Sequence, residues 1–239
     1  MKETPEPPRW EGWRKALKQE LGVLAFFAGF EAAITGVYAL VQLGPGPGDF
    51  IDTWLRARWS TPWGAATAIF VHLGFEHYSG NALGLLAILA LFVPADWSFR
   101  IASSRRTWPL LLAVVGSAVV GNLLSTWRVP APLPGSSPLG ASGIEYGLLG
   151  AALALAVLNS AHYVRLWGNQ RRSGRPSLLV AWLAAMNLVF CLPLVLLRSP
   201  AEFFAVASAN GLVHIVGFFG GLLTGLCYGL LWFLEAWNS

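Results

Sequence analysis

The sequence predicts an all-α polytopic membrane protein, a bundle of six transmembrane helices with an interfacial segment in its first outer loop. Hydrophobic residues make up 55% of the chain and charged residues 12%, whereas roughly a quarter of a soluble domain is charged. Apolar runs near the ~20 residues that a helix needs to cross a bilayer recur along the chain. Twelve tryptophans suit two membrane–water interfaces, where the indole ring is favoured.

The apolar runs divide the chain into one transmembrane domain, residues 20–234, and two short tails. Residues 1–19 are polar and basic, and we expect a cytoplasmic tail that ends in an interfacial helix through Trp10, Trp13 and Leu17. Residues 235–239 form a cytoplasmic C-terminal tail. Proline is expected to end the second span at Pro94. The six expected spans are residues 20–43, 77–93, 108–127, 142–159, 178–197 and 211–234.

Residues 49–71 have a composition between that of a span and that of a loop. Trp54, Trp59 and Trp63 are interspersed with charged residues. A segment with this balance is expected to lie along the membrane interface instead of crossing the bilayer. An ordinary long loop is the alternative, which the tryptophans disfavour.

The distribution of lysine and arginine predicts the orientation in the membrane. With the N-terminus inside, 12 of the 16 basic residues fall in inner segments and 4 in outer segments. Because cytoplasmic loops carry an excess of basic residues, both termini are expected to be cytoplasmic. The acidic residues Glu3, Glu6 and Glu11 argue against a transit peptide, so we expect the plasma membrane of a prokaryote.

Composition also argues against several kinds of partner. The net charge of +4 does not indicate a nucleic-acid partner, because the basic residues fall between the spans. Cys191 and Cys227 lie inside apolar runs and are interpreted as packing residues. Neither a disulfide framework nor a metal site is indicated, and no cofactor is expected. The lipid bilayer is the partner that the composition itself requires.

Four polar residues are expected at one depth near the outer face of the membrane. The second, fourth and sixth spans all start on that side, with His77 and Asn81 at the start of the second. Ser142 opens the fourth span, and His214 lies about a turn into the sixth. At 1.5 Å per residue, all four fall within roughly one helical turn in depth. Because polar groups are costly inside a membrane, such a cluster indicates a functional site.

The residue types in this cluster suit nucleophilic catalysis. A serine hydroxyl is a weak nucleophile until a base takes its proton, and His214 is the candidate base for Ser142. The protonated base then acts as the acid toward the leaving amine. No aspartate falls within the expected spans, so the arrangement is a Ser-His dyad, with Tyr146 one turn below Ser142 to hold the imidazole by stacking. For His214 alone, an ordinary hydrogen-bonded contact is the alternative.

His77 and Asn81 are expected to stabilise negative charge. They are four residues apart and therefore share a helix face. Both side chains can donate hydrogen bonds to an oxyanion, and the backbone N–H of Ser142 can join them. These three donors form the predicted oxyanion hole.

Glycines stand where helices approach one another and where the serine must stay accessible. Gly140 and Gly143 flank Ser142. A stripe of glycines starts one turn after His214 and is expected to bring the sixth span against the fourth. Its members are Gly217, Gly221, Gly225 and Gly229. Plain helix packing is the alternative interpretation of the stripe, and the two are compatible.

At these residues the chain resembles the rhomboid family of intramembrane serine proteases. Four motifs carry the resemblance, in the order and on the spans that the family has. They are His72-x4-His77-x3-Asn81, Gly140-Ala141-Ser142-Gly143, Tyr146, and His214 with Gly217 and Gly221. The resemblance covers all six spans. One departure lies in the first outer loop, where Trp63-Gly64 stands in place of a frequent Trp-Arg pair.

The resemblance implies a six-helix bundle with a water-filled active site below the outer surface. It also implies cleavage of transmembrane protein substrates within or near their spans, without a cofactor. It makes Ser142 the nucleophile and His214 the general base. His77, Asn81 and the Ser142 amide would form the oxyanion hole, and His72 would be structural, with hydrogen bonds in the first outer loop.

Three alternatives to this protease remain. A rhomboid-like pseudoprotease would bind membrane-protein clients without cutting them, although inactive relatives usually lack the serine or the histidine. A small transporter or channel would need an ion site at mid-membrane, and only Glu31 supports such a site. The plainer interpretation of Glu31 is a carboxyl group that is hydrogen-bonded within the bundle. A subfamily that processes C-terminal sorting tails is the third. Glu145 is interpreted as lying outside the catalytic set, facing water or the first loop.

Overall fold

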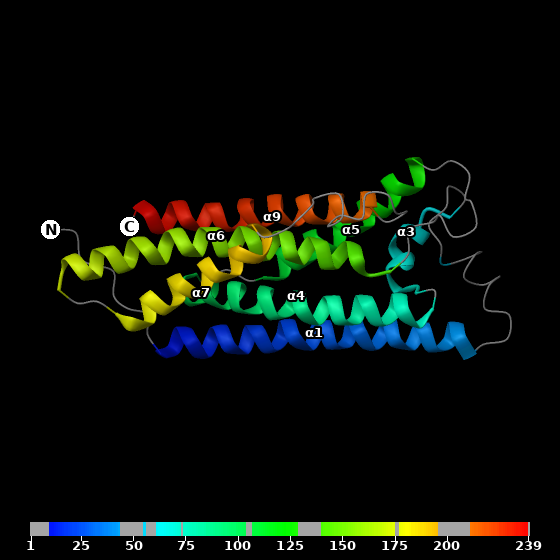
Figure 1. Ribbon diagram of the computed structural model, residues 1–239, viewed down its shortest axis with the longest axis horizontal. Helices are drawn as coiled ribbons and strands as arrows, with labels where there is room; N and C mark the ends of the chain where they lie inside the picture. The colour runs from blue at the N-terminus through cyan, green and yellow to red at the C-terminus, as the bar shows by residue number, and fades with distance from the viewer. Residues whose placement is uncertain are drawn as a thin grey trace.

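The computed structural model describes residues 10–43, 55, 61–72, 74–103, 107–128, 140–174, 177–195 and 211–238. Within these residues the chain is almost entirely helical (Figure 1). The long helices are α1 (Trp10–Leu43), α4 (Phe75–Ala102), α5 (Trp108–Arg128), α6 (Ser142–Arg172), α7 (Leu178–Val195) and α9 (Gly211–Asn238). Two short elements, α3 (Gly64–Thr67) and the 3-10 helix η2 (Ala68–Phe70), precede α4.

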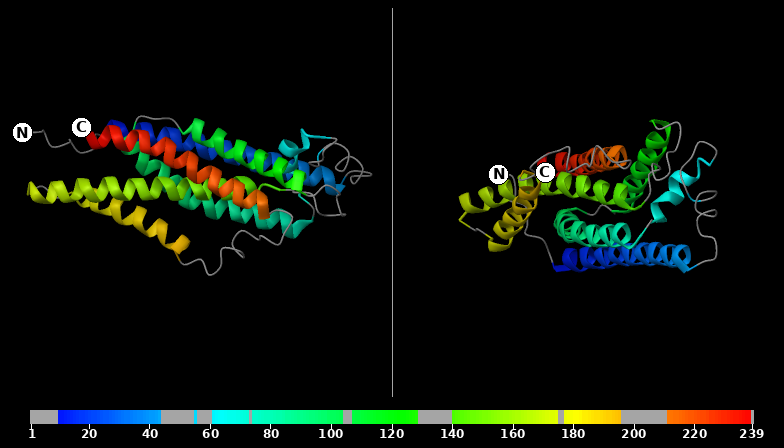
Figure 2. Two further views of the ribbon diagram at one scale, coloured as in Figure 1. Left: turned by 90° about the horizontal axis from the view of Figure 1, so that it is seen from above. Right: turned by 45° about the vertical axis from the view of Figure 1, so that its right-hand side comes forward.

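Helix α6 lies at the centre of an elongated bundle (Figures 1 and 2). It packs against α4, α5, α7 and α9, whereas α1 lies on the outside of the bundle against α4. Of the apolar stretch of α6, 72% is buried, compared with 17% for α1. The residues that open α6 are therefore surrounded by other helices, while α1 leaves most of its surface to the membrane.

Five of these helices are long and apolar enough to cross a membrane, so the chain is a multi-pass membrane protein. The candidate spans are Arg14–Gln42, Phe75–Ile101, Trp108–Trp127, Ser142–Arg172 and Gly211–Leu231. Helix α7 contributes a shorter apolar stretch, Leu178–Val189. The all-helical membrane fold is thereby confirmed, and the crossing by α7 that would make six spans stays a prediction.

The first turn of α1 and the last turn of α9 lie at the same end of the bundle (Figure 1). The opposite end holds α3 and the first turns of α4 and α6. This arrangement agrees with an even number of crossings. Which end faces the cytoplasm stays a prediction from the basic residues.

The expected helix ends were wrong at three places. Helix α1 begins at Trp10, so the tail helix and the first span are one continuous element. Helix α4 passes through Pro94 and ends at Ala102, which transmembrane helices tolerate because neighbouring groups satisfy the freed backbone. Pro94 has no N–H for the Ala90 carbonyl, four residues earlier. One residue after the proline, Asn159 of α6 donates from its Nδ2 to the Ala95 carbonyl at 2.8 Å and ties α6 to α4.

Helix α6 does not end near residue 159 but continues to Arg172. At 1.5 Å per residue its 31 residues extend for about 46 Å, which exceeds the roughly 30 Å of a bilayer core. Gly174, with φ +71°, follows the last turn and provides the left-handed conformation that commonly ends a helix. The basic residues of this last turn therefore belong to a helical extension instead of a loop.

The expectation that the spans hold no aspartate was also wrong, because α4 continues through Asp96. The buried Asp96 Oδ2 accepts hydrogen bonds from Arg100 Nε at 2.7 Å and from Thr107 Oγ1 at 2.6 Å. Glu20 of α1 lies 2.9 Å from the same guanidinium. Asp96 is nineteen residues after His77 on α4, about 28 Å along the helix. It therefore joins α1, α4 and α5 at the far end of the bundle and does not orient His214.

A second buried polar cluster joins α7 to the bundle. Asn187 of α7 donates from its Nδ2 to Ser98 Oγ at 3.0 Å, and Asn159 donates to the same oxygen at 2.7 Å. Asn187 Oδ1 lies 3.1 Å from the same Asn159 nitrogen. Helices α4, α6 and α7 are thus held together by side-chain amides in a region with little water, where leaving such groups unpaired is costly.

The described part of the segment 49–71 packs on α5 and α1. Asn122 of α5 donates to the Ala65 carbonyl at 2.8 Å, and Thr67 donates to the Leu55 carbonyl at 3.0 Å. Trp63 is half exposed beside these contacts. Residues 49–54 and 56–60 lie outside the described residues, so the interfacial position of this segment stays a prediction.

Candidate active site

Ser142 is the first residue of α6 and follows a tight turn. Gly140 has φ +96°, a conformation that side chains with a Cβ rarely adopt. Its backbone N–H donates to the Ala68 carbonyl of η2 at 2.9 Å. The turn is therefore anchored on η2, and it presents the Ser142 hydroxyl at the end of the helix.

The structure brings Ser142 and His214 together. His214 Nε2 lies 2.9 Å from Ser142 Oγ, a hydrogen-bond distance, and both residues are buried, with exposed fractions of 8% and 7%. They come from α9 and α6 and are 72 positions apart in the sequence. A histidine beside a serine hydroxyl at this distance is suited to take its proton.

The small residues of α6 and α9 make this distance attainable. A Cβ atom built on Gly217 would collide with the Gly143 carbonyl oxygen, and one built on Gly221 would collide with the Gly147 carbonyl oxygen. Glycine is thus required at both positions for the two backbones to approach so closely. The stripe packs α9 onto α6, and in doing so it brings His214 to Ser142.

Tyr146 lies one turn after Ser142 and stacks on the His214 ring. The ring centroids are 4.3 Å apart and the planes are inclined by 19°. This contact limits the rotation of the imidazole. It corresponds to the stacking that the sequence predicts for Tyr146.

His77 and Asn81 lie on α4 beside the turn that precedes Ser142. A Cβ atom at Gly140 would lie 2.6 Å from Asn81 Nδ2 and 2.8 Å from His77 Nε2. Two side-chain nitrogens therefore flank Gly140, two residues before the serine. This contact also gives a second reason for glycine at position 140.

His72 orients Asn81. Asn81 Nδ2 lies 2.7 Å from His72 Nε2, and the His72 and His77 ring centroids are 5.1 Å apart. Burial, together with the neighbouring His77, lowers the pKa of His72 to about 4. A neutral imidazole accepts at one nitrogen, so Nε2 accepts from one N–H of Asn81. The second N–H of that amide remains for another acceptor.

Glu145 points neither to water nor to the first loop. It is buried, with an exposed fraction of 6%, and its carboxyl group lies against Gly84 of α4. The sequence contained a signal for this contact, because Gly84 follows Asn81 by three residues and Glu145 follows Ser142 by three. Glu31 of α1 lies close enough to interact electrostatically with Glu145.

In the part of the chain that the structure describes, no three or more His, Cys, Asp or Glu side chains gather in a way that could hold a metal ion. Cys227 is an exposed free thiol on α9. The side chain of Cys191 lies outside the described residues.

Comparison with known proteins points to one family. The model of the Rhomboid domain matches residues 60–233. The Rhomboid protease GluP of Bacillus subtilis (strain 168) is 26% identical to this chain over 213 residues, which cover 88% of this chain and 34% of that relative. This chain therefore spans about a third of the length of that relative. No solved structure matches the chain significantly.

Proposed function

Because the chain belongs to the rhomboid family, whose domain model matches residues 60–233, we propose that it is an intramembrane serine endopeptidase. It hydrolyses peptide bonds of transmembrane protein substrates with a dyad of Ser142 and His214. The observation that carries the proposal is the 2.9 Å separation of His214 Nε2 and Ser142 Oγ. The named protease activity of the Bacillus relative supports it.

In the proposed reaction, Ser142 Oγ attacks the carbonyl carbon of the scissile peptide bond. The hydroxyl proton passes to His214 Nε2, which gives it to the nitrogen of the leaving amine when the C–N bond breaks. A water molecule, deprotonated by His214, then attacks the acyl-enzyme and releases the second product and Ser142. Tyr146 keeps the imidazole plane in place through both proton transfers.

The carbonyl oxygen of the substrate becomes negatively charged in each tetrahedral intermediate. His77 Nε2, Asn81 Nδ2 and the Ser142 backbone N–H are proposed to donate hydrogen bonds to it. The support is that both side-chain nitrogens lie beside Gly140, and that α6 opens at Ser142. The first N–H groups of a helix have no partner within the helix, so the Ser142 amide is available. Donors positioned in advance stabilise this charge effectively in a site with little water.

The proposed orientation places both termini in the cytoplasm and the site toward the outer side of the membrane. It is supported by the excess of lysine and arginine in the inner segments. It is also supported by the position of the first turn of α1 and the last turn of α9 at one end of the bundle (Figure 1). A prokaryotic plasma membrane is the proposed location.

A pseudoprotease that only binds its clients is not favoured. Such a protein does not need a serine and a histidine at hydrogen-bond distance from each other. Nor does it need a tyrosine stacked on that histidine. The test is labelling of the purified protein with a fluorophosphonate probe, which reacts with an activated serine. We expect labelling of the wild type and none of the Ser142→Ala variant. A wild type that stays unlabelled while it binds membrane-protein clients would favour the pseudoprotease instead.

A further inference from the structure

Glu145 has no part in the proposed reaction, yet it is enclosed one turn from the nucleophile. It is 6% exposed, and its Oε1 atom is buried without a hydrogen-bond partner in the described part of the structure. A buried polar atom without a partner costs free energy, so its presence calls for an explanation.

The carboxyl group of Glu145 occupies the space that a side chain at position 84 would need. A Cβ atom built on Gly84 would collide with Glu145 Oε2 and would lie 3.3 Å from Glu145 Cδ. Glycine at position 84 therefore leaves a notch in α4, and the carboxyl group lies in it. Glu31 is close enough to interact electrostatically, but two ionised carboxylates repel each other. Shape explains the contact better than charge does.

This contact lies one turn below the proposed oxyanion donors. Gly84 follows Asn81 by three residues, and Glu145 follows Ser142 by three. A slip of α4 by one turn along α6 would move the donor nitrogens by about 5.4 Å. The carboxyl group in its notch opposes such a slip. It does so within one turn of Asn81, so it acts close to the donor nitrogens whose positions depend on the placement of α4 along α6.

We propose that Glu145 is a positioning residue: its carboxyl group, fitted against Gly84, sets the register of α4 on α6 and thereby holds His77 and Asn81 at the oxyanion. This inference rests on the proposed protease function. The role needs the size of the carboxyl group and not its charge. Glu145→Gln therefore keeps most of the activity, while Glu145→Ala empties the notch and Gly84→Ala fills it with a methyl group.

The test is a double-mutant cycle on cleavage of a model transmembrane substrate in reconstituted membranes. Each single alanine variant is expected to lower the maximal rate by about ten- to a hundredfold with little change in apparent KM, since a displacement near 1 Å at a site costs about that much. In the double variant Gly84→Ala/Glu145→Ala the methyl group at position 84 takes the vacated space, and the rate returns to within a few fold of wild type. The melting temperature of each variant is measured in parallel.

Three outcomes overturn the proposal. If the single variants have a lower melting temperature but cleave at the wild-type maximal rate when folded, Glu145 is a packing residue only. Losses that add up in the double variant would show that the two positions do not act through their contact. A Glu145→Gln variant as slow as Glu145→Ala would show that charge matters. A wild type without cleavage or fluorophosphonate labelling would instead overturn the proposed function, and coupling between the melting temperatures would still test the contact itself.

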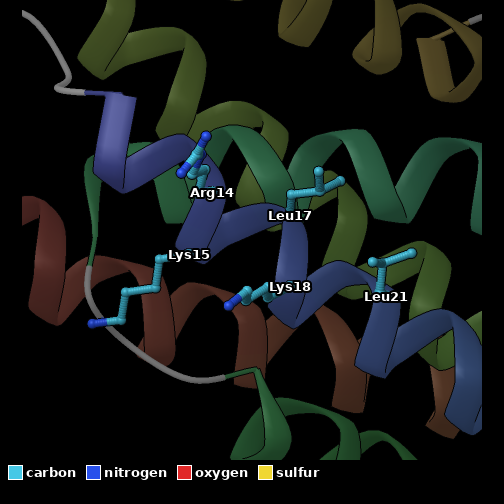
Figure 3. A pocket seen from close by; sticks show the side chains of 5 residues that line it. All are labelled: Arg14, Lys15, Leu17, Lys18 and Leu21. Carbon is cyan, nitrogen blue, oxygen red and sulfur yellow. The ribbon is translucent and has the colours of Figure 1, made fainter.

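A separate observation concerns the other end of the bundle, on the outward face of α1. A hollow of about 580 Å³ is lined there by five residues (Figure 3). They are Arg14, Lys15, Leu17, Lys18 and Leu21. All five are exposed, and the two leucines are more than half exposed, with fractions of 56% and 58%. Three cations thus lie beside an apolar surface that continues toward the middle of α1.

We propose that this face of α1, the basic hollow, binds an anionic phospholipid. The candidate span starts at Arg14, so the cations lie where headgroups are and the leucines lie deeper, where acyl chains are. Basic side chains at a membrane surface attract anionic headgroups, and only 17% of the apolar stretch of α1 is buried by other helices. The order of charge and apolar surface along α1 matches that of a lipid.

The test compares the association of spin-labelled phosphatidylglycerol and phosphatidylcholine with the reconstituted protein. We expect a severalfold preference for phosphatidylglycerol, lost in Arg14→Gln/Lys15→Gln/Lys18→Gln. The matched control, Arg165→Gln/Arg171→Gln/Arg172→Gln, removes the same charge from the end of α6 and is expected to keep the preference. A wild type without preference, an equal loss in the control, or displacement by millimolar inorganic phosphate would each overturn the proposal.

Discussion

The substitution Asn81→Ala tests the proposed oxyanion hole and has two calculable effects. It removes one donor beside Gly140, and loss of one such donor typically lowers the rate by about 10²–10³-fold. We expect a decrease of about 10²-fold, at the mild end, because His77 and the Ser142 amide remain. It also removes the partner of His72 at 2.7 Å, which leaves a buried acceptor unsatisfied and costs about 1–3 kcal/mol of stability.

The assay is the initial rate of cleavage against the mole fraction of substrate in reconstituted membranes, at a temperature where the variant is fully folded. The maximal rate should fall while the apparent affinity stays the same, because the donor acts only on the developing charge. His77→Ala should cost more. Ser79→Ala is the control, a neighbouring change on α4 that removes a hydrogen bond from Ser79 Oγ to the Glu76 carbonyl, and it should have no effect. A lower affinity with an unchanged maximal rate would refute the assignment.

Three further predictions test other parts of the account. Because burial and His77 lower the pKa of His72 to about 4 from 6.5, the unfolded state binds more protons between these values; the melting temperature should therefore fall as the pH drops from about 6.5 toward 4, and His72→Gln should flatten this decline. Arg100→Gln leaves Asp96 and Glu20 buried without their cation and should destabilise the protein by about 3–5 kcal/mol in chemical denaturation; no measurable change would contradict the role of this cluster. Cysteine accessibility should find residue 172 on the cytoplasmic side and residue 132 outside; the reverse pattern would contradict the orientation.

Much of the fold was predictable because membrane crossing imposes strong constraints on sequence. Long apolar runs predicted the helices, and the Rhomboid domain match confirms the family that the motifs suggested. The helix ends were less predictable. Proline usually ends or kinks helices in soluble proteins, but α4 continues past Pro94, and Asp96 pairs with Arg100 inside the bundle. Hydropathy along the sequence does not show which polar residues will pair with one another inside the bundle.

For the site, the expected depth of each polar residue along its span indicated correctly which of these residues lie close together. Ser142 and His214 lie 2.9 Å apart, and Tyr146 stacks on the imidazole as expected, although the catalytic roles stay predictions. The partner of His72 was not predictable, because rotation of α4 decides that Asn81 faces it. The position of Glu145 was missed for a related reason: a buried acid next to a glycine notch depends on the register of two helices, which no single segment specifies.

Cleavage of a transmembrane substrate by purified, reconstituted variants tests most directly whether Ser142 and His214 form a catalytic dyad. Wild type should cleave within or near the substrate span, while Ser142→Ala and His214→Ala should show no cleavage and retain the helical content and melting temperature of a folded protein. A purified Ser142→Ala variant that cleaves at the wild-type rate would contradict the dyad and the mechanism built on it.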